Sequence, residues 1–202
     1  MRSDITRNME RCTIVMKPLS TAGGVGRYNE TRWYAWSIYL PKEKEFSAGD
    51  SYPAVTHWLN HAQIIYNDAN RVGKALFHLV PRDNRWQAQV RGGPINKYKT
   101  KFFNFGSLKR GVWHDFLMEF HYHGNDGKAL TRIQYRAGGG SFVEVVNDKR
   151  ANVPLTTLPP AQHVYSFDLG IYRDGRQNGD QVIYVDGPWV GKTQADVSPF
   201  FK

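Results

Sequence analysis

The feature that most constrains the fold is a series of short segments in which apolar and polar residues alternate. A period of two is typical of a strand that buries one face. No segment sustains the 3.6-residue period of an amphipathic helix, apart from one expected helical turn near 42–48. Turn residues separate the segments, as in Asn125-Asp126-Gly127, Gly138-Gly139-Gly140 and Asp186-Gly187-Pro188. This pattern predicts an all-β fold, a sandwich or jelly roll.

The 202 residues are expected to form a single jelly-roll domain, 1–202, in which residues 1–12 are a loose N-terminal arm. Strands are expected at 13–16, 27–41, 53–59, 62–67, 74–80, 85–91, 101–105, 112–123, 130–136, 141–146, 163–173 and 181–186. The chain has no internal repeat and no low-complexity linker that would divide it further.

The segment His163 to Arg173 gives the clearest strand pattern. Its apolar positions, Tyr165, Phe167, Leu169 and Ile171, would face the core, so Tyr172 would face away from it. Gly170 lies beside that tyrosine and leaves room for a ligand to approach the sheet. A phenol at such a place can hydrogen-bond a ligand or exchange a proton with it, although a plain surface tyrosine fits the pattern equally well.

A second segment shows a polar face of the same kind. Trp86, Ala88 and Val90 alternate with Gln87, Gln89 and Arg91. Similar alternation over 116–123 gives a face that carries His121 and His123, for which no third ligand of a zinc site is evident. If several such faces line one concave sheet, they form a groove suited to a hydroxylated, acidic polymer.

Charge also favours an anionic partner, because 27 Lys and Arg residues outnumber 18 Asp and Glu residues and give a formal net charge of +9. No nucleic-acid-binding motif is present, which argues against nucleic acid as that partner. The single cysteine, Cys12, excludes an intramolecular disulfide. Neither a signal peptide nor a run of membrane-spanning length is recognised, so no membrane partner is expected, and the protein is expected to be a monomer.

The order of three motifs resembles that of the jelly-roll, concanavalin-like polysaccharide lyases, which include heparin lyase I, the glucuronan lyases and, more distantly, the alginate lyases. The motifs are Trp36-Ser37-Ile38-Tyr39-Leu40-Pro41, Gly111-Val112-Trp113-His114-Asp115-Phe116, and Leu169-Gly170-Ile171-Tyr172-Arg173 followed by Val182-Ile183-Tyr184-Val185-Asp186. The resemblance covers about residues 23–192. It implies a concave substrate groove and cleavage of a uronate polymer by β-elimination.

The resemblance also implies roles for individual residues. The catalytic histidine of the family falls on His57, with His61 as the substitute if the register differs, and the catalytic tyrosine falls on Tyr172. A glutamine that binds the substrate carboxylate falls on Gln89, with Gln87 as the other candidate. We expect His57 to act as the base, or as partner to a tyrosine base, and Tyr172 as the proton donor.

Other residues are expected to bind the substrate or depart from the family pattern. The binding candidates are Arg27, Arg32, Gln87, Arg91, His121 and Arg173. Asp168 stands where the family often has a lysine, and Val55 stands where it has a glutamine.

Asp174, Asn178 and Asp180 are candidates for a structural calcium site or a plain acidic turn; no cofactor is expected to be required.

The sequence therefore predicts a polysaccharide lyase that leaves a 4,5-unsaturated uronate end on an anionic polysaccharide. The alternative is a non-catalytic, lectin-like module that binds an acidic glycan. Either protein is expected to be extracellular or associated with a phage particle.

Overall fold

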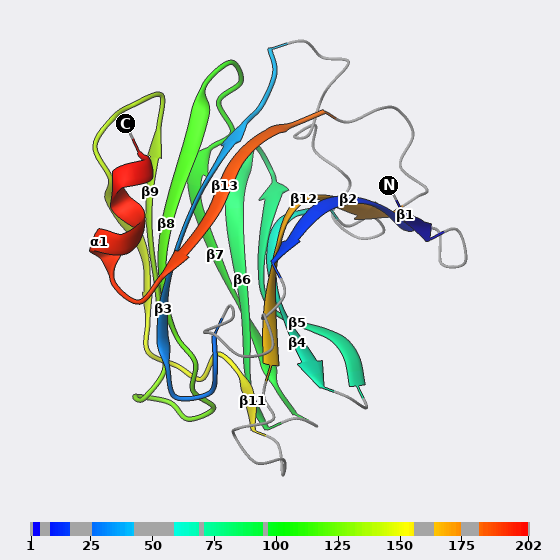
Figure 1. Cartoon of the computed structure of the whole chain (residues 1–202), viewed down its shortest axis with the longest axis vertical. Helices are drawn as coiled ribbons and strands as arrows, with labels where there is room; N and C mark the ends of the chain where they lie inside the picture. Colours follow the sequence, from blue (N-terminus) through cyan, green and yellow to red (C-terminus); the bar gives the residue numbers. More distant parts are fainter. Residues whose placement is uncertain are drawn as a thin grey trace.

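The computed structural model describes residues 2–4, 9–16, 26–42, 59–68, 71–94, 97–155, 164–174 and 182–201. Within these ranges the chain forms two β-sheets that face each other, with a short helix at the C-terminal end (Figure 1). Nearly all strand pairs are antiparallel. The predicted jelly-roll sandwich is confirmed.

The larger sheet carries the polar face of residues 85–91. Its strands are, in spatial order, β1 (Arg2–Asp4), β2 (Met9–Met16), β12 (Val164–Asp174), β4 (Leu59–Asp68), β5 (Arg71–Arg82) and β6 (Arg85–Pro94), followed by β7 (Lys99–Ser107) and β11 (Pro154–Leu155), which both pair with β6. Because β12 lies between β2 and β4, the late segment that holds Tyr172 is placed inside this sheet.

The smaller sheet carries those aromatic residues of the three motifs that do not lie on β12. Its order is β10 (Val143–Asp148), β9 (Leu130–Ala137), β8 (Trp113–His121), β3 (Thr31–Tyr39) and β13 (Tyr184–Gly191). Helix α1 (Gln194–Val197) and the 3-10 turn η4 (Ser198–Phe200) follow β13 and lie against the outer face of this sheet (Figure 1). There Val197 packs with Trp33, Ala35 and Leu117.

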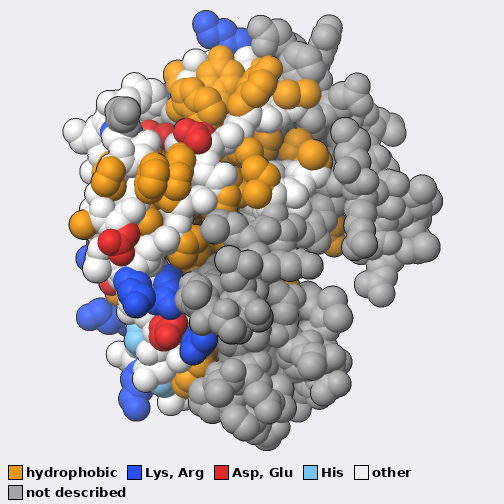
Figure 2. Space-filling view, in the orientation of Figure 1, with side chains coloured by type: hydrophobic (Ala, Val, Ile, Leu, Met, Phe, Trp, Pro, Cys, Tyr) orange, Lys and Arg blue, Asp and Glu red, His pale blue; other side chains and the backbone are white. Residues whose placement is uncertain are grey.

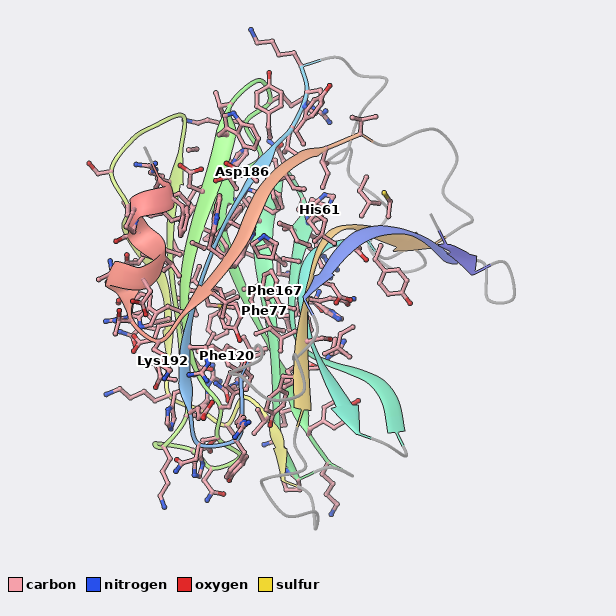
Figure 3. All side chains as sticks on the ribbon, in the orientation of Figure 1. His61, Phe77, Phe120, Phe167, Asp186 and Lys192 are labelled. Atoms are coloured by element: carbon pink, nitrogen blue, oxygen red, sulfur yellow. The ribbon has the colours of Figure 1, made fainter. Side chains whose placement is uncertain are left out.

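Large aromatic side chains fill the space between the two sheets. Phe77 and Phe167 come from the larger sheet and Phe120 from the smaller one, and all three are fully buried (Figure 3). Trp36 stacks on Phe116 at a centroid distance of 5.2 Å. Because each such side chain contributes about 1.5–3 kcal/mol when it is buried, this layer dominates the stability of the fold.

The core confirms the strand polarities expected from the sequence. Trp86, Ala88 and Val90 are buried in it, as are Tyr165, Phe167 and Leu169. Ser166 and Asp168 on the opposite side of β12 are nevertheless also buried, so this side is less open than the alternation indicated.

Several boundaries differ from the expectation. Residues 2–4 and 9–12, expected in a loose arm, belong to β1 and β2, since β2 pairs with β12 over eight residues. The strand expected at 27–41 begins only at Thr31, because Asn29 has a left-handed φ of 64° in a turn. The turn expected at Asp186-Gly187-Pro188 lies within β13, where the pairing with β3 shifts register. Residues 53–58 and 43–48 lie outside the described residues.

Candidate functional site

A row of side chains crosses the outer face of the larger sheet. In the strand register Asp168 is opposite Gln63, Gln63 is opposite His78, His78 is opposite Gln89, and Gln89 is opposite Phe102. These five residues, here called the outer-face row, come from five neighbouring strands. Neighbouring strands lie about 4.8 Å apart, so the row extends across the middle of the sheet.

Hydrogen bonds fix the amides of this face. Gln63 Nε2 donates to Oδ2 of the buried Asp168 carboxylate at 2.9 Å. Gln89 Nε2 donates to Gln87 Oε1 at 3.0 Å, and Gln87 Nε2 donates to Asn104 Oδ1 at 2.8 Å. Because each primary amide carries two N–H groups and an acceptor oxygen, it can also bond a ligand. The predicted binding residues Gln87 and Gln89 therefore lie together in a pre-oriented network.

His78 is the imidazole of the outer-face row. The pKa of His78 is lowered to about 3, chiefly by burial and also by the nearby positive charge of Arg91, while a hydrogen bond with Gln89 opposes the shift. The ring is consequently neutral near pH 7 and presents one donor and one acceptor nitrogen. Arg91, two residues after Gln89 on β6, is half-buried and adds a cation to the same face.

Phe102 ends the outer-face row with an apolar surface. Its side chain is 57% exposed, whereas most large aromatic side chains of this protein are buried in the core. An exposed ring beside fixed amides can stack on an apolar face of a ligand while the amides hold its polar edge.

Tyr172 lies on β12 next to a break in the strand pairing. The register with β4 shifts between Leu169 and Tyr172, and Gly170 has φ +143°. A β-bulge of this kind re-aims the side chains that follow it. Tyr172 is half-buried and is opposite Arg11 of β2 and Asn60 of β4 in the pairing. Its partner on β4, Asn60, is three residues before Gln63. Tyr172 therefore lies on the strand next to β4, but three residues away from the position of Gln63.

Of the two candidate histidines, His57 lies outside the described residues. His61, its substitute, is buried with its ring 5.9 Å from the core side chain of Trp86. Its Nδ1 donates to the carbonyl oxygen of Gly170 at 3.2 Å. The structure thus places His61 at the core, where it supports the bulge before Tyr172 (Figure 3).

Three other predicted binding residues gather elsewhere, at the start of β3. Arg27, Glu30, Thr31, Arg32 and Lys192 line an open pocket of about 460 Å³, here called the basic pocket. The buried Arg32 pairs with Glu30 at 2.8 Å, and Thr31 Oγ1 is 2.9 Å from His121 Nδ1. Figure 2 shows Lys and Arg side chains around an acidic one, beside a histidine, on this part of the surface.

The predicted site therefore divides into two groups. Gln87, Gln89, Arg91 and Tyr172 belong to strands of the larger sheet, whereas Arg27, Arg32 and His121 lie at one end of the smaller sheet. The backbone of Arg173 pairs with Glu10 and Leu59 in the larger sheet. Thus the polar faces that were expected to line one groove lie on two different sheets.

Three residues of the outer-face row were not among the site residues expected from the sequence. Gln63 and His78 lie on strands that were expected at 62–67 and 74–80, and Phe102 lies on one expected at 101–105. The local pattern does not mark them, because Leu76 and Val80, which share the parity of His78, are apolar, and Phe102 is itself apolar. Only the register, which depends on strand order, puts His78 and Phe102 opposite Gln89, and Gln63 opposite His78.

The described residues offer no metal centre: none of their His, Cys, Asp and Glu side chains gather in a group of three or more. Asn178 and Asp180, two of the three calcium candidates, lie outside these residues. Nor is any helix of the described part long and apolar enough to cross a bilayer.

Comparisons with known proteins agree with this architecture. The family model described as polysaccharide lyase matches residues 1–188. An endo-β-1,4-glucuronan lyase from the fungus Trichoderma reesei is similar in structure, with a TM-score of 0.61 and 16% identity over 92% of this chain and 82% of that one. A family 7 alginate lyase in complex with a product has a TM-score of 0.53 and 15% identity over 83% and 64% of the two chains. None of the curated proteins matches the chain.

Proposed function

The chain belongs to the polysaccharide lyase family, and on this basis we propose that it cleaves a uronate-containing, anionic polysaccharide by β-elimination. The observation that carries this proposal is the outer-face row, in which amides from β4 and β6 flank a neutral imidazole across the outer face of the larger sheet. The net charge of +9 favours an acidic polymer.

Elimination begins with loss of the proton on C5, next to the uronate carboxylate. The negative charge that develops on that carboxylate must be neutralised, and Gln89 and Arg91 of β6 supply amide N–H groups and a positive charge for this. Because the network through Gln87 and Asn104 already fixes the amide, little reorganisation is needed when the charge appears.

The proton transfers are assigned to a histidine and a tyrosine. The His57 imidazole takes the C5 proton, the electron pair of that C–H bond forms the C4=C5 double bond, and the C4–O bond breaks. Tyr172 then gives its phenolic proton to the departing oxygen. In support of this role, Tyr172 follows the bulge at Gly170, whose carbonyl oxygen is bonded by His61, on a strand that also contributes Asp168 to the row. The atoms balance without a cofactor.

The remaining binding candidates bind the polymer away from the cleaved bond. Arg27, Arg32 and His121 at the basic pocket, and Arg173 on β12, would attract further carboxylates of a long chain. On this proposal the enzyme acts as a monomer where its polymer is found, outside a cell or on a phage particle.

The test is cleavage of glucuronan, alginate, heparin and hyaluronan, followed by the ultraviolet absorbance of the unsaturated product. We expect at least one polymer to be cleaved, and Tyr172→Phe to lower kcat by about a hundredfold or more because the proton donor is lost. Gln89→Ala should lower kcat/KM by about a hundredfold. His57→Ala should behave like Tyr172→Phe.

Matched controls come from the smaller sheet and its edge. Tyr28→Phe removes the hydroxyl of a tyrosine that packs 5.1 Å from His123, and Gln134→Ala removes an amide of β9. Both should leave cleavage unchanged. Full activity of both Tyr172→Phe and His57→Ala would refute the assigned roles.

A further inference from the structure

A second surface, remote from the outer-face row, carries three aromatic side chains in register. Tyr184 of β13 is opposite Tyr39 of β3, and Tyr39 is opposite Trp113 of β8. The Tyr39 ring centroid is 5.9 Å from that of Tyr184 and 5.5 Å from that of Trp113. These three residues are here called the aromatic platform.

The platform lies on the outer face of the smaller sheet. Trp33, Ala35 and Leu117 share this face and are covered by α1, whereas Tyr39 and Trp113 lie at the opposite ends of the same strands. Tyr184 is 58% exposed and Trp113 is 40% exposed. Figure 2 shows hydrophobic side chains gathered at this end of the molecule. Since exposed aromatic clusters are unfavourable in water, such a patch indicates a ligand surface.

Charged groups beside the platform indicate what it binds. The Lys42 stem lies against the backbone of Gly111, which precedes Trp113 by two residues. Arg110 is held beside it by donation from Nη1 to the Pro41 carbonyl oxygen at 3.4 Å. One exposed carboxylate, Asp186, lies two residues after Tyr184 on β13 (Figure 3). Lys42 and Arg110 therefore lie near the platform in the chain fold, while the other carboxylate of this face, Asp115, is already paired with Arg136.

We propose that the aromatic platform is a second, non-catalytic binding site for an acidic polysaccharide. Pyranose rings present C–H faces that stack on aromatic rings, and the platform offers one ring per strand, a spacing close to the length of one sugar unit. Lys42 and Arg110 then meet the carboxylates at the edges of the sugars. The ligand class rests on the proposed function; the existence of a stacking surface does not.

The test is retention in native gels that contain glucuronan or alginate, with Tyr172→Phe as the background so that the polymer stays intact. Trp113→Ala and Tyr184→Ala should each weaken retention about five- to tenfold, and the double variant should weaken it more. Val143→Ala removes an exposed apolar side chain from β10 and is the matched control, since Val143 is 60% exposed. Thermal unfolding confirms that each variant is folded.

Kinetics in the active protein give the second readout. Trp113→Ala should raise KM for the long polymer but leave kcat/KM for a trisaccharide unchanged, because a short substrate cannot reach both surfaces. Retention equal to that of the parent in the double variant, or an equal loss in Val143→Ala, would overturn the inference. Retention through the platform by a protein that forms no unsaturated product would uphold it while contradicting the proposed function.

Discussion

His78 shows what a single half-buried residue does to the pH response of this protein. Since its pKa is about 3 in the folded chain and near 6.5 in the unfolded chain, the unfolded chain binds more protons between these values. The lowered pKa therefore leaves stability unaffected above about pH 6.5, and stability is lost as the pH falls toward 3. We expect a loss of about 1–2 kcal/mol between pH 7 and pH 5 from this residue.

Chemical denaturation of the parent and of His78→Gln at these two pH values measures that contribution. His114 also has a lowered pKa because of burial, so the parent's whole pH dependence is not assigned to His78. The difference between the two proteins in this pH dependence isolates the contribution of His78. The free energy of unfolding of His78→Gln should fall less on acidification. Equal slopes in the two proteins would mean that His78 remains accessible to protons.

At the scale of the element, the bulge in β12 determines where Tyr172 lies. Gly170→Ala places a Cβ against the carbonyl oxygen of Cys12 and forces a non-glycine residue to φ +143°. We expect it to lower the free energy of unfolding by about 2–4 kcal/mol and to reduce cleavage, since the pairing with β2 must shift. Thermal unfolding and the ultraviolet assay measure the two effects.

Gly139→Ala is the matched control for this prediction. Gly139 has φ +76° in an exposed turn, and a Cβ there meets nothing within 4 Å. This variant therefore has only the backbone strain, about 1 kcal/mol, and should keep full activity. A Gly170→Ala protein no less stable than Gly139→Ala would show that the bulge tolerates a side chain.

The strands were predictable from the sequence wherever one face is apolar. The alternation of Trp86, Ala88 and Val90 correctly identified the core side of β6, because burial imposes a period of two. The continuation of β13 through Gly187-Pro188 was not predictable, since this dipeptide is typical of turns and only the pairing with β3 keeps it in the sheet. The four-residue helix α1 is too short to show a period.

At the scale of the whole molecule, strand order decides which polar faces meet. Gln89 and His121 both alternate with core residues, and nothing local to either segment shows that they lie on different sheets. Pairing β12 between β2 and β4, far apart in sequence, brings Tyr172 to the same sheet as Gln89. The chemical types of the site were thus predictable, whereas its division from the basic pocket was not.

The chemistry of cleavage tests the central claim most directly. The parent protein is incubated with glucuronan or alginate in water enriched in oxygen-18, and the products are measured by mass spectrometry. Elimination adds no water, so we predict products that contain no oxygen-18 at the cleaved bond and end in a sugar lighter by one water molecule. Products that carry one oxygen-18 atom for each bond broken would show hydrolysis and contradict the account.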